Sequence, residues 1–215
     1  FWLKKNLAKL IKFSLDTKIV VIDNYSSDKS ISYIKNNFKS IEIIKHNHNY
    51  GFSKAYNIVL KKLQFDYFLI INNDVEVTKD FLPPLFDFLI KNKKFAAVQP
   101  KILDGNNKRK FEYSGASGGF IDYFGIPFCR GRIGHFIEED KGQYNKETSI
   151  FWASGACFLI EKKSFLKVDG FDEDFWMHQE EIDLCWRIQN LGKKIGYCHK
   201  SKVYHYGGGT LKKGN

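Results

Sequence analysis

The sequence predicts an α/β protein in which helices cover a mostly parallel sheet. Over residues 1–98, short apolar, β-branched runs alternate with segments of helical periodicity. Turn and helix-cap residues separate these segments. Hydrophobic residues make up 43% of the 215 residues, which supplies enough apolar mass for the core of one substantial domain. We therefore expect a single domain with one covered sheet.

The first expected element is a basic amphipathic helix over residues 1–13. Its apolar side carries Leu3, Leu7, Leu10 and Ile11. A helix of this kind can lie on a lipid surface or cover a sheet. The α/β pattern that follows favours the second role.

The remaining elements follow from the periods of strands and helices. Strands are expected at residues 18–22, 41–45, 67–71, 95–98, 151–160, 194–197 and 202–206. Helices are expected at residues 30–38, 53–63, 78–90, 162–168 and 180–191. Pro83 and Pro84 suit the first turn of a helix, and Gly192 suits a helix end. Residues 104–148 are punctuated by glycines and predict a loop-rich region.

The formal net charge of +10 suits a nucleic acid, an anionic membrane face or a phosphorylated small substrate. The lysines are scattered through helix-like segments, and the sequence shows no arginine-rich block and no nucleic-acid module. We therefore expect no nucleic-acid partner. Peripheral attachment to a membrane is compatible with the charge.

The cysteines predict a reducing compartment. They are Cys129, Cys157, Cys185 and Cys198, which form no C-x-x-C pair and have apolar neighbours. Buried free thiols are therefore expected, while the even count leaves disulfides open. No apolar stretch has the length of a membrane span and no secretory signal is visible, so we expect a cytoplasmic protein.

A carboxylate follows the apolar run at residues 67–71, which ends in Asn72, Asn73 and Asp74. Parallel sheets bind ligands at the ends of their strands. Mg²⁺ or Mn²⁺ held there by Asp74 could neutralise a diphosphate, because these ions prefer carboxylate and phosphate oxygens. Asx residues after a strand also form simple turns, so the position alone leaves both interpretations open.

Two further groups can carry chemistry. Glu180, Glu181 and Asp183 begin the last expected helix, where the helix dipole favours acidic residues in any case. Apolar neighbours could raise the pKa of one of these carboxyl groups, which could then act as a general base. His205 is followed by glycines that allow close approach of a ligand. It could complete a metal site or be a packed histidine.

Six parts of the chain resemble motifs of the family-2 glycosyltransferases and occur in the family's order. They are residues 21–30, 49–57, 71–77, 154–160 and 170–187, and the closing His205. The first resembles D-N-x-S-x-D-x-S, the second N-x-G-F-x-x-A-x-N, and the fifth contains a likeness of E-D-x-D-L-C-x-R. The resemblance is to the rhamnosyltransferase-like branch. It implies the GT-A fold, a Rossmann-like sheet with a short additional antiparallel element.

The resemblance also implies roles for single residues. The nucleotide-binding positions are Asp23, Asn24, Gly51, Lys54, Asn57 and Asn73. The metal ligands are Asp74 and His205, and the acceptor-binding residues are Trp152, Gly155 and Asp183. Glu181 takes the position of the catalytic base, and Glu180 remains a rival because the reach of a base is geometric before it is electronic.

The reaction implied by the resemblance is an inverting sugar transfer that uses Mg²⁺ or Mn²⁺. The donor is a UDP- or dTDP-sugar, and the acceptor is a hydroxyl of a glycan or lipid-linked molecule in surface polysaccharide biosynthesis. The implied location is the cytoplasm, with peripheral attachment at the inner face of the plasma membrane. Residues 1–103 would form the nucleotide-binding half and residues 104–215 the acceptor-binding and catalytic half.

Three departures from the family pattern stand out. The D-x-D motif is reduced to its last residue, Asp74, and Glu181 replaces the usual Asp. The family's first strand would lie before Phe1 and is expected to be missing. Two other classes therefore stay open, namely a non-catalytic nucleotide- or sugar-binding relic of a transferase and a basic membrane-surface binding protein.

Overall fold

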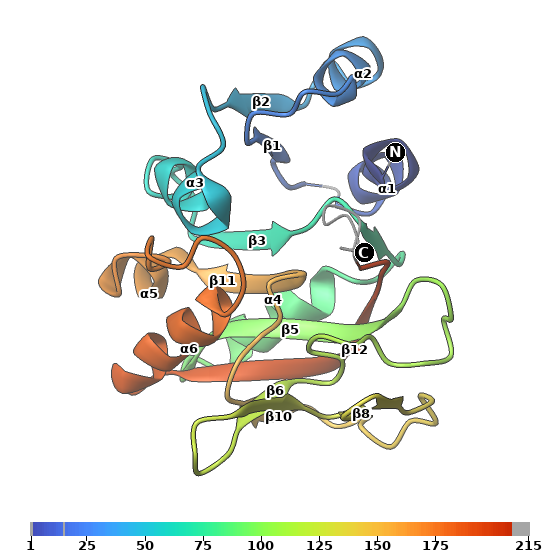
Figure 1. Ribbon diagram of the computed structural model, residues 1–215, viewed down its shortest axis with the longest axis vertical. Helices are drawn as coiled ribbons and strands as arrows, with labels where there is room; N and C mark the ends of the chain where they lie inside the picture. The colour runs from blue at the N-terminus through green and yellow to red at the C-terminus, as the bar shows by residue number, and fades with distance from the viewer. Residues whose placement is uncertain (1, 15, 208–215) are drawn as a thin grey trace.

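The computed structural model describes residues 2–14 and 16–207, and a six-stranded mixed sheet lies at its centre (Figure 1). The strand order is β10 (Thr148–Ile150), β12 (Lys194–His205), β5 (Phe95–Asp104), β11 (Cys157–Glu161) and β3 (Tyr67–Ile71), and β4 (Val75–Val77) also pairs with β12. β5 and β12 are parallel, whereas β3, β4, β10 and β11 run antiparallel to their partners. The predicted α/β class is confirmed, and the central sheet is more mixed than the sequence indicates.

β1 (Val20–Asp23) and β2 (Glu42–Lys45) form a separate two-stranded parallel sheet. Figure 1 shows this pair above β3, together with α2 (Ser30–Asn37) and α3 (Gly51–Leu60). α1 (Trp2–Phe13) lies against β4. The first helix therefore covers a strand, which is the role that the α/β pattern favours.

Local sequence signals explain where the other helices begin and end. α4 (Pro83–Lys91) starts with two prolines, which lack amide hydrogens that a first helical turn would leave unpaired. α5 (Lys162–Lys167) follows β11 directly. α6 (Glu180–Asn190) ends just before Gly192, whose φ of +77° suits the left-handed end of a helix.

Two strand predictions need correction. Within residues 151–160, where small residues precede a strand-like run, the strand begins at Cys157, because the Ser154 amide donates to the Gln99 side chain and cannot join a ladder. The strands expected at residues 194–197 and 202–206 form the single strand β12, whose pairing with β5 shifts register between Cys198 and Lys202.

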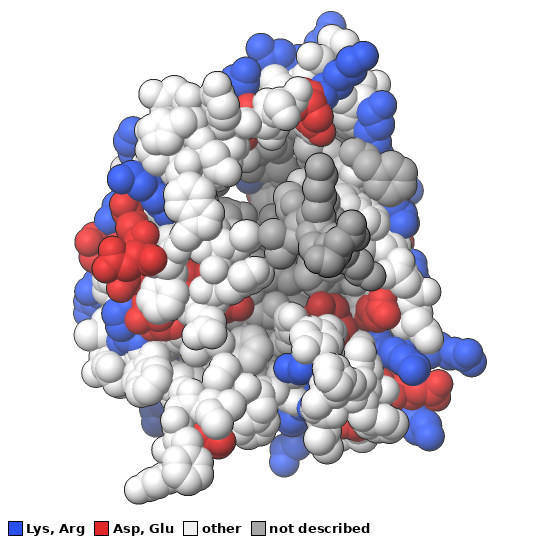
Figure 2. All heavy atoms as spheres, in the orientation of Figure 1, with Lys and Arg blue, Asp and Glu red and all other residues white. Residues whose placement is uncertain are grey.

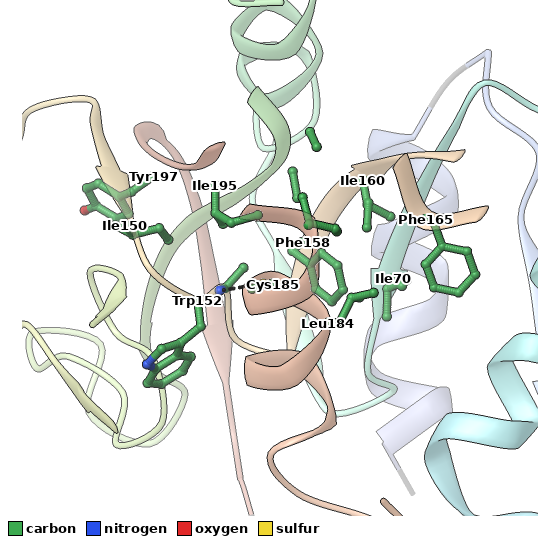
Figure 3. Close-up of a cluster of buried hydrophobic side chains, with 14 of the residues drawn as sticks. Ile70, Ile150, Trp152, Phe158, Ile160, Phe165, Leu184, Cys185, Ile195 and Tyr197 are labelled. Atoms are coloured by element: carbon green, nitrogen blue, oxygen red, sulfur yellow. Dashed lines mark hydrogen bonds between the residues drawn. The ribbon is translucent and has the colours of Figure 1, made fainter. Parts of the chain in front are cut away.

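The main core lies between the sheet and α6, as Figure 3 shows. Its largest contributors include Ile70, Phe158, Ile160, Phe165 and Leu184. All four cysteines are buried and free, which confirms the expectation of unpaired thiols.

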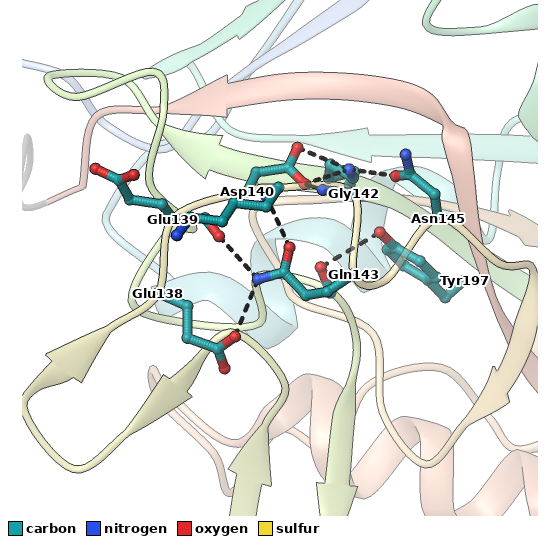
Figure 4. A network of polar contacts seen from close by, with 10 residues as sticks. Glu138, Glu139, Asp140, Gly142, Gln143, Asn145 and Tyr197 are labelled. Atoms are coloured by element: carbon teal, nitrogen blue, oxygen red, sulfur yellow. Dashed lines mark hydrogen bonds and ion pairs between the residues drawn. The ribbon is translucent and has the colours of Figure 1, made fainter.

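The glycine-rich region between β5 and β10 folds into two hairpins. They are β6 (Gly119–Ile121) with β7 (Pro127–Cys129), and β8 (Arg132–Ile133) with β9 (Phe136–Ile137). Beneath them lies Lys101 of β5, which is 2% exposed. Its amine donates to Asp140 at 2.8 and 2.7 Å and to Asn145 at 2.6 Å (Figure 4), so the buried charge is paired.

The surface gives no sign of one concentrated basic patch on the face seen in Figure 2, where lysines and arginines lie mostly around the rim. Among the described helices, none combines the length and apolar character needed to span a bilayer.

Candidate functional site

Asp74 lies in the turn between β3 and β4. β4 pairs with the end of β12 so that Val75 stands opposite His205, and the Tyr206 amide donates to the Asp74 carbonyl at 3.1 Å. The expected setting at the end of a buried parallel strand is wrong, because β3 pairs antiparallel with β11. The β4–β12 pairing, and not the sheet edge, directs the carboxylate toward the imidazole.

His205 lies between two buried carboxylates. Its Nε2 is 3.2 Å from Asp74 Oδ1, and its Nδ1 is 3.2 Å from Glu112 Oε1. The second contact has an ion-pair distance, although Nδ1 is not aligned for a hydrogen bond with any described residue. Burial alone would lower the pKa of His205, but contacts with the two carboxylates outweigh it and raise the pKa to about 10.

Asp74 and His205 fit the ligand set of a divalent cation once the incoming cation has displaced the imidazole proton. Two ligands that each lie about 2.1 Å from one ion are separated by about 3 Å, which matches the observed 3.2 Å between Oδ1 and Nε2. Glu112 stands where a carboxylate commonly orients a metal-binding histidine through its other ring nitrogen. Across residues 2–14 and 16–207, no three His, Cys, Asp or Glu side chains are grouped to hold a metal. Phosphate oxygens and water would have to complete the coordination.

We call the group formed by Asp74, His205 and Glu112 the cation corner. Glu76, two residues after Asp74, lies next to it in the chain. It is 6% exposed and accepts hydrogen bonds from Lys9, Lys108 and Tyr206. Burial acts to raise the pKa of Glu76, but these three donors together lower it to about 2. The residue is therefore a buried, charged and fully paired carboxylate.

The second carboxylate group begins α6. His178 and Gln179 directly precede it with φ values of +74° and +67°, a conformation that is uncommon outside glycine and often found at functional sites. Glu180 is buried and Glu181 half-buried. In each, the Oε2 atom has no hydrogen-bond partner among the described residues.

Burial is the main cause that raises the pKa of Glu181 to about 7, and the charge of Glu180 acts in the same direction. Backbone hydrogen bonds, including one from Gly155, oppose this shift. Burial also raises the pKa of Glu180. Glu181 is therefore suited to accept a proton near neutral pH.

Gly155 and Ala156 join the two carboxylate groups. A methyl group at Gly155 would lie 3.7 Å from Cδ of Glu181. The next carbonyl, that of Ala156, accepts a hydrogen bond of 3.0 Å from the Asn72 amide. The backbone between them spans from the proton acceptor to the turn that carries Asp74.

A second connection runs through serines. The Ser154 hydroxyl donates to the Ser114 carbonyl at 2.7 Å, and the Ser114 amide donates to Glu112 at 2.6 Å. Because Glu112 contacts His205, the segment before β11 is tied to both sides of the cation corner.

The loop before α3 is held by Asn24. Its Nδ2 donates to Asn49 Oδ1 at 2.8 Å and to the Gly51 carbonyl at 2.9 Å, and its Oδ1 accepts from the Tyr50 amide at 2.9 Å. Gly51 has a φ of +74°, and a Cβ there would lie 2.7 Å from the Trp176 carbonyl. Glycine is therefore required at this position.

Asp23 and Asn73 are two further positions expected to bind the nucleotide. Asp23 ends β1, is buried, and accepts a hydrogen bond from the Ser26 amide at 3.1 Å. The exposed Asn73 has its carbonyl bound by the Asn6 side chain at 2.9 Å.

The fold agrees with what is found in known proteins. The family model described as glycosyl transferase family 2 matches residues 2–169. The chain belongs to this family.

Relatives in the family are distant in sequence. Rhamnosyltransferase WbbL of Escherichia coli (strain K12) is 25% identical over 212 residues, covering 95% of this chain and 78% of the relative. The N-acetylglucosaminyl-diphospho-decaprenol L-rhamnosyltransferase of Mycobacterium tuberculosis is 23% identical, covering 87% and 66%. Agl10 of Haloferax volcanii, a low-salt glycan biosynthesis hexosyltransferase, is 22% identical, covering 87% and 58%. The chain thus spans less than two thirds of the length of the last two relatives.

Solved structures show the fold. GalNAc-T7, crystallised with UDP, GalNAc and Mn²⁺, has a TM-score of 0.73 at 17% identity, covering 94% of this chain and 40% of that chain. TarS of S. aureus has a TM-score of 0.64 at 15% identity, covering 95% and 34%. The predicted GT-A fold is confirmed.

Two positions of the family's nucleotide motif have structural partners. Asn57 is buried, its Nδ2 donates to the Phe171 carbonyl at 2.8 Å, and its Oδ1 accepts from the Phe171 amide at 3.0 Å. It therefore clamps the turn before α6, and its amide is not free for a nucleotide. Lys54 is partly exposed and lies 3.4 Å from Glu173.

The acceptor positions inferred from the family divide into two kinds. Trp152 lies in the core and its indole donates to the Phe120 carbonyl at 2.8 Å, so this packing does not support an acceptor contact (Figure 3). Asp183 is engaged by Arg187 at 2.8 and 2.5 Å. Gly155, by contrast, lies beside Glu181.

The sequence alone did not identify Glu112 or Trp176 as residues of the site. Glu112 lies in the glycine-rich region, where no local pattern marks it. Trp176 is 58% exposed, and its carbonyl accepts from the Phe52 amide at 2.9 Å. The signal in the sequence is its place among the apolar residues just before the acidic start of α6.

Proposed function

We propose that this chain is a metal-dependent, inverting glycosyltransferase that moves a sugar from a UDP- or dTDP-sugar to a hydroxyl acceptor. The observation that carries the proposal is the backbone of Gly155 and Ala156. It lies against Glu181 at one end and is hydrogen-bonded to Asn72, in the turn of Asp74, at the other. The candidate proton acceptor and the turn of the candidate metal ligand thus contact the same short backbone segment.

The roles of the residues follow from their chemistry. Glu181, with a pKa of about 7, takes the proton of the acceptor hydroxyl as its oxygen forms a bond to the anomeric carbon. The bond from that carbon to the diphosphate breaks on the opposite face, which inverts the configuration. Mg²⁺ or Mn²⁺, held by Asp74 and His205, would stabilise the negative charge on the departing diphosphate. Glu112 orients His205 in this scheme.

The donor nucleotide is assigned to the side of Asp23 and the loop held by Asn24. Asp23 ends a strand and Asn24 orders the start of α3, so both lie where this family's nucleotide motif occurs. Asn73 and Lys54 remain further contacts in this proposal, whereas Asn57 is assigned to support of the turn.

On the acceptor side, we assign Trp176 as an aromatic contact in place of Trp152. Phe52, whose amide binds the Trp176 carbonyl, has its ring tip 3.9 Å from the position of a Cβ on Gly155. Trp176 is therefore joined through Phe52 to the Glu181 region and offers an exposed apolar ring. Gly155 lines the same place.

The names of two relatives support an acceptor class for this proposal. Their names include a diphospho-decaprenol acceptor and glycan biosynthesis, which supports a glycan or lipid-linked acceptor for this chain. We assign the reaction to the inner face of the plasma membrane, an anionic surface to which a chain of net charge +10 can attach peripherally.

A screen of UDP- and dTDP-sugars by thermal shift, with and without Mn²⁺, tests the proposal. A donor should raise the melting temperature only in wild type and not in Asp74→Asn, because ligands stabilise the state that binds them. Release of nucleotide diphosphate with a lipid-linked acceptor should then require Glu181. Donor binding without turnover on any acceptor would support the binding-relic class instead.

A further inference from the structure

The Glu76 carboxylate ties three separate segments to one point. Its Oε1 accepts from Lys9 of α1 at 2.6 Å and from Lys108, in the loop after β5, at 3.1 Å. Its Oε2 accepts from the Tyr206 hydroxyl at the end of β12, also at 2.6 Å. Glu76, of which 6% is exposed, is the buried centre of this cluster.

Each tied segment also carries a group of the candidate cation corner. Tyr206 directly follows His205, and its amide donates to the Asp74 carbonyl. The loop of Lys108 leads to Glu112, which contacts His205.

α1 reaches the same corner from the other side. Its Asn6 side chain donates to the Asn73 carbonyl at 2.9 Å, so Lys9 and Asn6 hold the two sides of Asp74. The stacking of Trp2 on Tyr206, with ring centroids 4.6 Å apart, adds an apolar contact.

The corner needs such support because Asp74 and His205 come from different elements. β4 has three residues and pairs with β12 only over Val75 to Val77, which is a short ladder. A site for a small cation requires its ligands to be held within about half an ångström. The charged Glu76 side chain supplies this restraint, because it binds the segments on both sides of the two ligands.

We propose that Glu76 is a positioning residue that holds Asp74 and His205 at the separation a divalent cation requires. This inference rests on the cation site of the proposed function. An ordinary stabilising cluster would lower the melting temperature when broken and leave cation affinity unchanged. A positioning residue controls the affinity itself.

The test measures Mn²⁺ binding to the 215-residue chain. Electron paramagnetic resonance reports the concentration of free Mn²⁺, at a temperature where all variants are folded. Glu76→Gln keeps the side-chain size but loses the charge, and should weaken Mn²⁺ binding about tenfold or more. Glu161→Gln is the matched control, because Glu161 is also a partly buried, ion-paired glutamate but lies at the far end of β11 from Cys157. It should bind Mn²⁺ as wild type does.

Asp74→Asn separates the possible failures. Weak binding in Asp74→Asn together with wild-type binding in a folded Glu76→Gln would overturn the role of Glu76 and leave the cation site standing. Equal binding in wild type and Asp74→Asn would overturn both. If Glu76→Gln does not fold, Tyr206→Phe removes one tie and keeps the Lys9 pair. It should weaken Mn²⁺ binding several-fold, and wild-type affinity in Tyr206→Phe would overturn the inference.

Discussion

Gly155 lies directly beside the Glu181 carboxyl group, since a methyl group added at Gly155 would stand 3.7 Å from Cδ of Glu181. The missing side chain leaves room next to the candidate base. The same contact supplies a backbone hydrogen bond that opposes the effect of burial on the Glu181 pKa. Gly155 therefore moderates the proton affinity of the candidate base, whose pKa is raised mainly by burial.

Replacement of the candidate base should abolish transfer and spare donor binding. Glu181→Gln keeps the shape but cannot accept a proton, so kcat should fall by about 10²- to 10⁴-fold. Mn²⁺-dependent donor affinity, measured by calorimetry, should stay near that of wild type. Glu180→Gln is the matched variant and should cost much less. A greater loss in Glu180→Gln would make Glu180 the base.

The rate should depend on pH through Glu181. The base must be deprotonated, and its pKa of about 7 predicts that kcat/KM rises about tenfold per pH unit below pH 7 and levels off above it. A pH profile of initial rates measures this. A profile that is level from pH 5 to pH 8 would exclude Glu181 as the titrating group.

Stability gives an independent check of the same pKa. In the folded chain the pKa is raised from 4.5 to about 7, so folding favours the protonated form. Between pH 4.5 and pH 7, Glu181 is deprotonated in the unfolded chain but still protonated in the folded chain. The free energy of unfolding therefore falls as the pH rises through this range. Glu181→Gln should therefore be more stable than wild type by roughly 1–3 kcal/mol at pH 8 and equal to it near pH 4.

Removal of the carboxylate behind His205 should weaken cation binding. Glu112→Gln leaves the imidazole without its charged partner, and Mn²⁺ affinity should drop about 10- to 100-fold. Electron paramagnetic resonance of free Mn²⁺ measures the change. Glu138→Gln, at a half-buried glutamate directly after β9, serves as the control and should leave affinity unaltered.

Asn57 should affect folding and not nucleotide recognition. Asn57→Ala leaves the amide and carbonyl of Phe171 without their partners, so the free energy of unfolding should fall by roughly 2–4 kcal/mol in urea denaturation. Asn37→Ala, at an exposed helix end, should cost less than about 1 kcal/mol. A stable Asn57→Ala that no longer binds donor would restore the nucleotide role.

Trp176 should act on the acceptor. Trp176→Ala should raise the KM for acceptor about tenfold, since an aromatic contact contributes on the order of 1 kcal/mol or more, and leave the donor KM unchanged. Trp186→Ala is a matched control, because Trp186 is 47% exposed but packs on Phe151. A change in the donor KM alone would assign Trp176 to the nucleotide.

Features that depend only on a short stretch of sequence could be predicted from the sequence. The order of helices and strands, the prolines of α4, the glycine after α6 and the free thiols all follow from local periodicity, caps and spacing. The family motifs located Asp74, Glu181 and His205 for the same reason, because each lies in a recognisable short segment.

Only the tertiary structure decided which of these residues meet, and what surrounds them. The antiparallel β4–β12 pair brings His205 to Asp74, and an unmarked loop residue, Glu112, completes the contact. Trp152 enters the core while Trp176 stays exposed. Strand pairing and burial depend on contacts between segments far apart in the chain, so local periodicity could not reveal them.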